Sequence, residues 1–286
     1  MAEIRVGTSS WSDFASFYPP GLPGPQQIGF YAQRFAVVEL NATFYRLMPA
    51  RNFSAWASRT PPGFIFDVKP FQQLTWHDRT TPPTPEVAAE FAASLQPLRA
   101  AGKLGALHFQ FPPWFVFSTA NLDYLTGLRQ TFADPLSVEF RHRSWLAAEA
   151  LPTVRQALER ADIALTVVDE PQVGSGSIPT VPIVTAPGLC IVRFHGRNTG
   201  LWYARVKRAA DRFDYLYSAD ELQAWVPTLA ELAALTAHLH VLFNNNAHDY
   251  AIDNALQMHR LLTAALGAAV VQPIGPDDDA APTLPL

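Results

Sequence analysis

Residues 191–197, Ile-Val-Arg-Phe-His-Gly-Arg (IVRFHGR), alternate apolar residues with Arg193, His195 and Arg197. This period of two is typical of a β-strand, in which successive side chains point to opposite faces of a sheet. The pattern therefore predicts that the two arginines and the histidine share one face. Such a face needs either solvent or counter-charges, and the rest of the sequence favours counter-charges.

The chain contains seven other short runs with strand character. These seven runs are at residues 4–8, 37–41, 64–69, 104–111, 136–141, 163–169 and 238–245. The stretch quoted above belongs to an eighth run, at residues 189–196. Helical patterns lie between most of them. Thr84 and Pro85 mark one helix start, and Ser218 and Glu221 have the spacing of a capping box. Eight strands alternating with helices predict an α/β fold, a TIM-like (β/α)8 barrel formed by a single domain, with an open doubly wound sheet as the alternative.

Two segments interrupt this alternation. Residues 170–188, between the sixth and seventh strands, are rich in Pro, Gly and Ser where a helix is due. We expect an irregular connection beside the barrel mouth, which makes it a candidate lid. Residues 271–286 lack periodicity and are acidic, so we expect a mobile C-terminal tail after a barrel domain of residues 1–270.

Composition limits the partners and the location. The 286 residues carry a net charge of −4, which gives no basic field for duplex nucleic acid or an anionic membrane. There is no apolar run of about 18 residues and no signal-peptide pattern at the start. Cys190 is the single cysteine, which excludes an internal disulfide and a cysteine-based zinc site. We therefore expect a cytoplasmic protein with neither a membrane nor duplex nucleic acid as a partner; the oligomeric state is not predicted.

Polar side chains recur near the carboxyl ends of the predicted strands, where barrel interiors normally contain Val, Ile and Leu. Because these ends meet at one mouth, we expect the polar side chains to form a ligand site, with Asn41, Lys69, Arg141, His195 and Asn244 converging there. The candidate ligand-binding residues are Asn41, Tyr45, Lys69, Gln110, Arg141, His142, Trp145, Asp169, Arg193, Arg197, Asn244 and Asn245.

Depth along the strands suggests different roles for the charged residues. Glu39, Glu139 and Arg193 lie deepest and are expected to pair with one another. An ion-pair network that only stabilises the barrel is the alternative, although burying ions costs several kcal/mol each. His108 and His240 lie in otherwise apolar runs and are expected to be hydrogen-bonded core residues.

Residues nearer the mouth are expected to contact the ligand. Arg141 and Arg197 suit bidentate binding of phosphate or carboxylate, and Lys69 supplies a point charge. The candidate catalytic residues are His195, as general acid or base, and Glu139 and Glu39, as its orienting partner or counterpart.

Tryptophans provide a second indication. Trp11, Trp76, Trp114, Trp145 and Trp202 each follow a predicted strand, where βα loops build the mouth. Flat apolar rings beside charged groups suit a sugar ring or a nucleobase. Ordinary packing within the loops is the alternative for each of them.

Longer motifs, in order along residues 4–265, resemble the YecE-like family, catalogued as a domain of unknown function. They are GTSSW, FYPPG, VELNATFYR, TPPGFIFDVKP, FQFPP, VEFRHRSW, RFHGR, DYLYSADEL and FNNNAHDYAIDNA. The resemblance implies a TIM-barrel-like fold and implies no established activity.

Function therefore has to be argued from the site. The expected excess of cations favours a hydrolase or lyase acting on a small phosphorylated or carboxylated sugar or nucleoside-like compound. The interleaved arginines disfavour a metal site but leave one possible, and the sequence does not indicate whether any other cofactor is needed. The alternatives are a metal-dependent phosphodiesterase or sugar isomerase, and a non-catalytic ligand-binding or scaffold protein.

Overall fold

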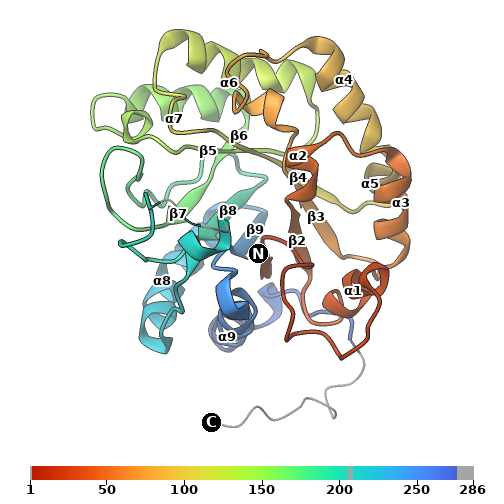
Figure 1. The fold of residues 1–286 in the computed structure, drawn as a ribbon. Coiled ribbons are helices and arrows are strands. Elements are labelled where there is room, and N and C mark those ends of the chain that lie inside the picture. The colour runs from red at the N-terminus through yellow and green to blue at the C-terminus, as the bar shows by residue number, and fades with distance from the viewer. Residues whose placement is uncertain (1, 205, 207–208, 276–286) are drawn as a thin grey trace.

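A computed structural model describes residues 2–204, 206 and 209–275. Within these residues, nine parallel strands form one curved sheet in the order β6-β5-β4-β3-β2-β1-β9-β8-β7 (Figure 1). The strands are β1 Glu3–Thr8, β2 Val37–Leu40, β3 Ile65–Val68, β4 Leu104–Gln110, β5 Leu136–Glu139, β6 Ile163–Leu165, β7 Val167–Asp169, β8 Cys190–Phe194 and β9 His238–Phe243. The first strand, β1, pairs with both β2 and the last strand, β9, so the first and last strands of the chain are neighbours in the sheet.

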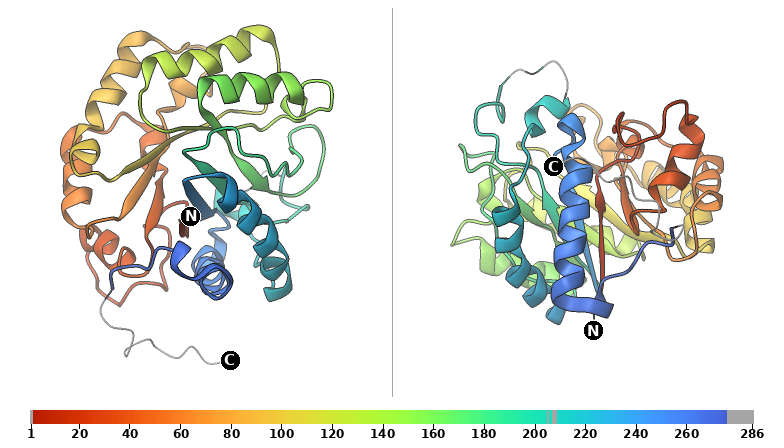
Figure 2. Two further views of the ribbon diagram at one scale, coloured as in Figure 1. Left: turned by 180° about the vertical axis from the view of Figure 1, so that it is seen from behind. Right: turned by 90° about the horizontal axis from the view of Figure 1, so that it is seen from below.

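Helices surround this sheet on its outer side (Figures 1 and 2). The α-helices are α1 Gly24–Tyr31, α2 Ala42–Tyr45, α3 Ala50–Ser58, α4 Pro85–Ser94, α5 Gln96–Ala100, α6 Thr119–Thr131, α7 Leu151–Ala161, α8 Ala219–Leu235 and α9 Tyr250–Leu266. Short 3-10 helices are η1 Gln72–Thr75, η2 Arg143–Trp145, η3 Ala209–Phe213, η4 Ala247–Asp249 and η5 Gly267–Ala269. The predicted cap at Thr84 and the capping box of Ser218 and Glu221 are both present.

The predicted (β/α)8 barrel is confirmed with one difference. The sixth predicted strand is divided at Thr166 into β6, which pairs with β5, and β7, which pairs with β8. Because only Thr166 separates the two halves, the sheet curls almost fully round, and its one seam lies between them. Alternation of apolar residues over 163–169 cannot reveal this division, since both halves are buried.

The connection from β7 to β8 contains no helix over its described length, as predicted from its Pro and Gly content. Its second half lies against the free edge of β6 at the seam. Thr185 accepts a hydrogen bond from Leu165 N at 2.8 Å and donates to Ile163 O at 2.7 Å. These bonds satisfy backbone groups of β6 that a neighbouring strand would otherwise pair. The loop thus replaces both a helix and part of a strand.

The barrel interior combines a small apolar layer with polar layers. Its apolar residues are Val37, Ala106, Ala164, Ala186, Leu189, Ile191 and Leu242, with Ile65 packed against them. The two histidines predicted for the core are hydrogen-bonded there. His240 contacts Asp67 at 2.8 Å, and His108 contacts Ser137 at 2.8 Å. The larger apolar core lies between the strands and the outer helices.

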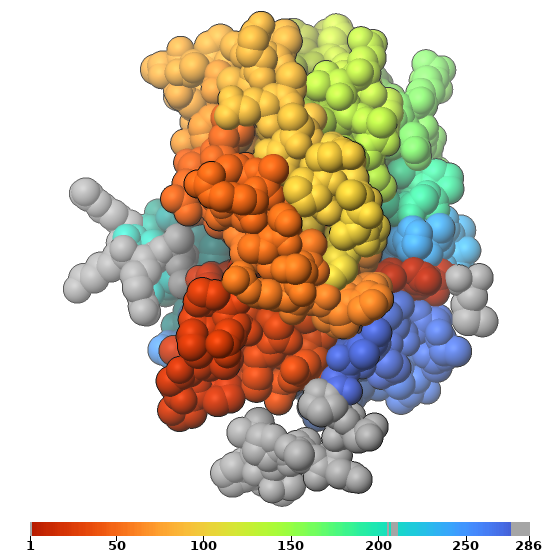
Figure 3. Space-filling view, turned by 90° about the vertical axis from the view of Figure 1, so that its right-hand side faces the viewer, coloured from red at the N-terminus to blue at the C-terminus, as the bar shows by residue number. Residues whose placement is uncertain are grey.

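The chain after α9 returns to the first strand. Val271 N donates to Ile4 O at 2.9 Å, so the predicted tail begins attached to the barrel. Residues 276–286, on which most of that prediction falls, lie outside the described residues. Figure 3 shows the flank where the C-terminal helix, in blue, lies beside the N-terminal segment, in red. No helix in the described part of the chain is both long and apolar enough to span a membrane.

Candidate functional site

The floor of the barrel mouth is a buried cluster of ion pairs. Arg193 in β8 donates to Glu39 Oε1 in β2 at 2.8 Å and to Glu139 Oε2 in β5 at 2.5 Å. Each of the three side chains is at most 1% exposed. The prediction that the deepest charges pair with one another is confirmed.

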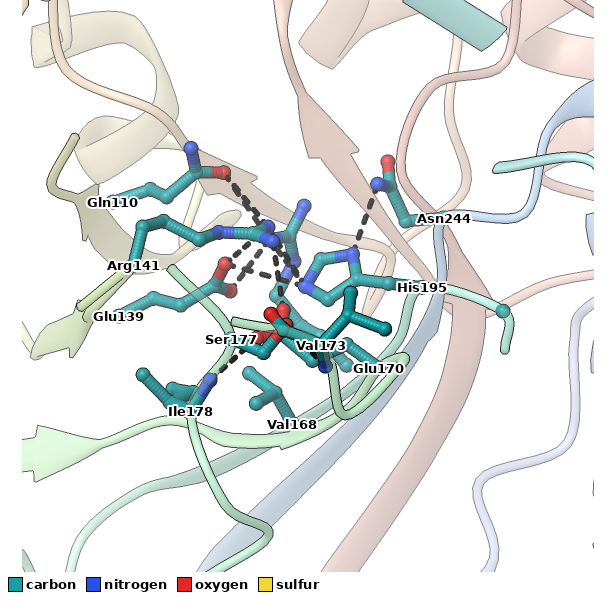
Figure 4. A network of polar contacts seen from close by, with 12 residues as sticks. Gln110, Glu139, Arg141, Val168, Glu170, Val173, Ser177, Ile178, His195 and Asn244 are labelled. Carbon is teal, nitrogen blue, oxygen red and sulfur yellow. Dashed lines mark hydrogen bonds and ion pairs between the residues drawn. The ribbon is translucent and has the colours of Figure 1, made fainter. Parts of the chain in front are cut away.

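Arg141 forms a second layer above this floor, just past the end of β5. Its Nη2 lies 2.5 Å from Glu139 Oε1, and its Nη1 lies 2.9 Å from Glu170 Oε2. The other oxygen of Glu170 accepts from Ile178 N at 2.8 Å, which fixes the start of the 170–188 loop (Figure 4). Glu170 therefore links this loop to the charges in the barrel.

The two carboxyl groups beside Arg141 differ in protonation. Burial alone would raise the pKa of Glu139, but Arg141 and Arg193 hold that pKa well below its ordinary value. Burial raises the pKa of Glu170 to about 7, although Arg141 opposes this shift. Glu139 is thus ionised at neutral pH, whereas Glu170 titrates near it.

His195 follows β8 and is fully buried between these groups. Its Nδ1 lies 3.0 Å from Asn244 Nδ2, and its Nε2 lies 3.2 Å from Glu139 Oε1 (Figure 4). Burial first, and Arg141 second, lower the pKa of His195 well below its ordinary value, so the ring is neutral at neutral pH. Its Nε2 also lies 2.9 Å from Arg141 Nη2. A guanidinium can only donate, so Nε2 of the neutral ring accepts from Arg141, and Nδ1 carries the proton that faces the Asn244 amide.

Gln110 at the end of β4 is surrounded by cations. Its Oε1 lies 3.2 Å from Lys69 Nζ, and 3.5 Å from a nitrogen of both Arg141 and Arg193. One neutral oxygen therefore faces three positively charged groups. Burial lowers the pKa of Lys69 to about 8 despite the attraction of Glu39.

Arg197 does not share the face of Arg193 and His195, so that prediction is wrong for this residue. Gly196 adopts a φ of +84°, a conformation that favours glycine, and this turn interrupts the alternation. Arg197 instead forms a bidentate pair with Asp169, at 2.8 and 2.5 Å, and contacts Glu221 at 3.0 Å. Its charge is engaged outside the barrel interior.

Asp169 lies with Arg197 and not with the mouth residues. Tyr217 and Trp225 also donate to its carboxylate, at 2.8 and 3.0 Å. Consecutive residues of an extended chain point to opposite faces, so Glu170, which the sequence analysis missed, faces Arg141 instead. The period of two along residues 164–170 is the signal that distinguishes the two acids.

Three other predicted residues stand apart from the mouth. Trp145 is fully buried and stacks on Phe140 at 4.3 Å, so it belongs to the core. His142 caps η2, because its Nδ1 accepts from Ser144 N at 3.3 Å, and the same nitrogen contacts the Ser144 hydroxyl at 2.8 Å. Tyr45 is 68% exposed and packs on Phe44.

The asparagines near the mouth mainly hold loops in place. Asn41 donates to Ser9 O at 3.0 Å, and the buried Asn245 donates to Tyr215 O and Asn254 Oδ1, both at 2.8 Å. Asn244 alone contacts the central cluster, through His195. Of the five residues expected to converge, Lys69, Arg141, His195 and Asn244 belong to one connected network.

A pocket of about 280 Å³ opens over this network. It is lined by Gln110, Pro113, Arg141, Gly176, Trp202, Tyr203, Arg212 and Phe213. Trp202 lies beside His195, with ring centroids 6.4 Å apart, and its ring faces the Arg141 guanidinium at 5.7 Å. Of the five tryptophans expected at the mouth, Trp202 is the one in this pocket. Tyr203, Arg212 and Phe213 were not identified from the sequence, because no strand carries them.

A second pocket, of about 500 Å³, lies between the 170–188 loop and α8, with Arg197 and Glu221 in its wall. It does not contain the residues that converge at the mouth. Among residues 2–204, 206 and 209–275, no three His, Cys, Asp or Glu side chains are grouped to hold a metal ion.

Comparison with known proteins identifies the family. The model for "Protein of unknown function DUF72" matches residues 5–278. The UPF0759 protein YunF of Bacillus subtilis is 37% identical over 266 residues, which cover 91% of this chain and 94% of YunF.

Solved structures agree with this match. A crystal structure of a DUF72 family protein from Thermotoga maritima superposes with a TM-score of 0.80 at 35% identity, covering 91% of this chain and 98% of that one. Another from Enterococcus faecalis superposes with a TM-score of 0.84 at 28% identity, covering 91% and 95%. The YecE-like resemblance is confirmed, and the chain belongs to the DUF72 family of proteins of unknown function.

Proposed function

We propose that the protein is an enzyme, a hydrolase or lyase, that acts on a small anionic sugar or nucleoside-like compound at the barrel mouth. The observation that carries this proposal is the convergence of Lys69, Arg141 and Arg193 on the one neutral oxygen of Gln110. Arg141 and Arg193 already pair with carboxylates, whereas Lys69 has no carboxylate of the described residues within 4.0 Å. An anionic group placed beside Gln110 would compensate Lys69 and accept further hydrogen bonds from Arg141.

The pocket above Gln110 supports an anionic ligand. Its described wall contains two arginines, Arg141 and Arg212, and no carboxylate. Arg141 Nε is buried without a hydrogen-bond partner in the described residues, so a donor there is unused. A planar guanidinium suits a phosphate or carboxylate, because two parallel N–H groups match two oxygens.

The aromatic side of the pocket supports a ring. Trp202 and Phe213 meet edge to face with centroids 6.0 Å apart, and Tyr203 completes this wall. Flat apolar faces next to cations would hold a sugar ring or a nucleobase by stacking while the arginines bind its anionic group.

Acid–base chemistry would use Glu170 and His195. Glu170 exchanges a proton near neutral pH, because burial raises its pKa to about 7. His195 is neutral and therefore acts as a hydrogen-bonding group or base, not as an acid. Glu139 and Glu39 would keep their negative charge on Arg193 and hold the cluster in place.

A thermal-shift screen against phosphorylated sugars, nucleotides and organic acids tests this proposal. A ligand that binds the folded state raises the melting temperature by mass action. Each phosphorylated compound is paired with its unphosphorylated form. We expect a rise for at least one phosphorylated or carboxylated compound and a smaller rise for its neutral partner. Equal shifts within every pair, or no shift at all, would reject the anionic ligand.

Turnover of the compound that binds separates an enzyme from a ligand-binding or scaffold protein. We expect the protein to convert that compound to a new species, detected by mass spectrometry. Recovery of the bound compound unchanged after prolonged incubation would favour the non-catalytic alternative.

A further inference from the structure

We propose that Lys69 is a nucleophile that forms an imine with a carbonyl group of the substrate. This inference rests on the proposed function and narrows its substrate class to anionic aldehydes and ketones, such as open-chain sugar phosphates. It also gives Lys69 a chemical role beyond that of a point charge.

The choice of lysine at this position is unusual within the chain. Lysine and arginine total 21 residues, and the lysines are Lys69, Lys103 and Lys207 alone. The remaining 18 cations are arginines, which never lose their proton in proteins. At the mouth, Arg141 and Arg193 already bind carboxylates. The cation at position 69 is the one there that is able to become a neutral amine.

The contacts of Lys69 leave its amine available. Lys69 is 8% exposed. Within the described residues its Nζ makes one hydrogen bond, which it donates to Gln110 Oε1 at 3.2 Å. No carboxylate oxygen of the described residues lies within 4.0 Å of it, and its other close neighbour is the Phe44 ring at 5.0 Å. Gln110 lines the pocket, so the hydrogen-bond partner of Nζ is itself a residue of the pocket wall.

Lys103 provides the contrast. It is 6% exposed and donates to Ala57 O at 2.7 Å, Thr60 O at 2.6 Å and Thr60 Oγ1 at 2.8 Å. All three of its N–H groups are used, as expected of a structural ammonium group. Lys69 has the same degree of burial with one neutral partner.

The surroundings of Lys69 favour the free amine. Burial lowers its pKa to about 8, and Arg193 and Arg141 add to this effect while Glu39 and Glu139 oppose it. About a tenth of the amine is then unprotonated at pH 7, which is the form that attacks carbonyl carbon. His77 on the same side does not compete as a cation, because burial, Lys69 and Arg141 lower its pKa to about 4.

The chemical step is balanced within the site. A bond forms between Lys69 Nζ and the carbonyl carbon, and the carbon–oxygen double bond of the substrate breaks. The two amine hydrogens leave with that oxygen as one water molecule, and nothing is oxidised or reduced. Protonation of the imine by solvent gives an electron sink, which would promote cleavage of an adjacent C–C or C–H bond, a lyase reaction.

Reductive trapping tests this inference. The protein is incubated with glycolaldehyde phosphate and sodium cyanoborohydride, which reduces an imine to a stable secondary amine, and adducts are located by peptide mass spectrometry. We expect one adduct on Lys69, none on Lys103, and at least tenfold slower labelling by uncharged glycolaldehyde. Inorganic phosphate should slow the labelling, and the rate should rise with pH up to about 8. The Lys69→Arg variant keeps the charge and should show no adduct at position 69 while melting as the wild type does.

The outcomes separate this inference from the proposed function. If glycolaldehyde phosphate raises the melting temperature but Lys69 is not labelled, the imine is rejected and the anion site stands. If Lys69 is labelled no faster than Lys103 or the N-terminus, the reactivity is unselective and the imine is also rejected. If Lys69 is labelled selectively but phosphate and charge have no effect, the nucleophile stands and the anionic substrate class does not.

Discussion

Arg193 donates to Glu139 Oε2 at 2.5 Å inside the barrel, where neither side chain is more than 1% exposed. Because the same guanidinium also pairs with Glu39, it compensates two buried carboxylates at once. Removing one partner of a buried ion pair leaves an uncompensated charge in a medium of low dielectric constant.

Arg193→Ala should therefore lower the free energy of unfolding by about 3–5 kcal/mol. Urea denaturation followed by circular dichroism measures this loss. Arg155→Ala is the control, since Arg155 forms an exposed pair with Glu159 on α7, and its removal should cost less than about 1 kcal/mol. Equal losses for the two variants would contradict the role given to Arg193.

Thr185→Val tests the loop that lies against the free edge of β6 at the seam between β6 and β7. The substitution keeps the shape of the side chain but removes the bonds to Leu165 N and Ile163 O, and should cost about 1–3 kcal/mol. Thr166→Val is a matched control, because the buried hydroxyl of Thr166 has no hydrogen-bond partner in the described residues. Chemical denaturation should find that variant as stable as the wild type or more so. A larger loss for Thr166→Val would contradict the assignment.

Arg197→Ala should reduce stability without affecting ligand binding. Its loss removes two hydrogen bonds from Asp169 and one from Glu221, while Tyr217 and Trp225 still donate to Asp169. At 39% exposure of Arg197, a cost of about 1–2 kcal/mol is expected. Melting curves with and without the ligand check this, and loss of the ligand-induced shift would return Arg197 to the binding site.

Glu170 should make stability depend on pH. Its pKa of about 7 in the folded protein exceeds the unfolded value of about 4.3, so the folded state holds this proton more tightly. The resulting stabilisation is full below about pH 4 and is lost as the pH rises through about 7.

Glu170→Gln removes this dependence. The free energy of unfolding of the variant should therefore increase relative to that of wild type between pH 5 and pH 8, because only the wild type loses stability over this range. Urea denaturation at each pH measures the difference. Glu90→Gln, on the exposed side of α4, should show the same pH dependence as wild type. A constant difference between Glu170→Gln and wild type across this range would contradict the assignment.

Alternation and strand ends predict much of this molecule from sequence. They identify the eight strand segments, the absence of a helix between 170 and 188, and the pairing of Arg193 with Glu39 and Glu139. Periodicity depends only on residues close together in the sequence, and charge compensation depends only on pairs of residues. Both can therefore be inferred from the sequence without the three-dimensional structure.

The sequence predictions that were wrong or incomplete also have identifiable structural causes. One left-handed glycine, Gly196, turns Arg197 away from the mouth, and the division at Thr166 breaks a strand whose residues are all apolar or buried. Trp145 follows a strand as the mouth residues do, but its indole stacks into the core. Tyr203 reaches the pocket from the connection between β8 and α8, and Phe213 from η3 in the same connection, and no periodic pattern in the sequence predicts the position of either.

Whether an anion binds beside Gln110 is tested most directly by the Gln110→Glu variant. The new carboxylate would lie among Lys69, Arg141 and Arg193, so we expect an unchanged or higher melting temperature without ligand. The melting-temperature shift produced by the anionic compound found in the screen should disappear, because the position is then occupied by a negative charge. Gln26→Glu, exposed on α1, should retain the full shift. A Gln110→Glu variant that binds the anion as tightly as wild type would show that the cations around Gln110 are not the binding site.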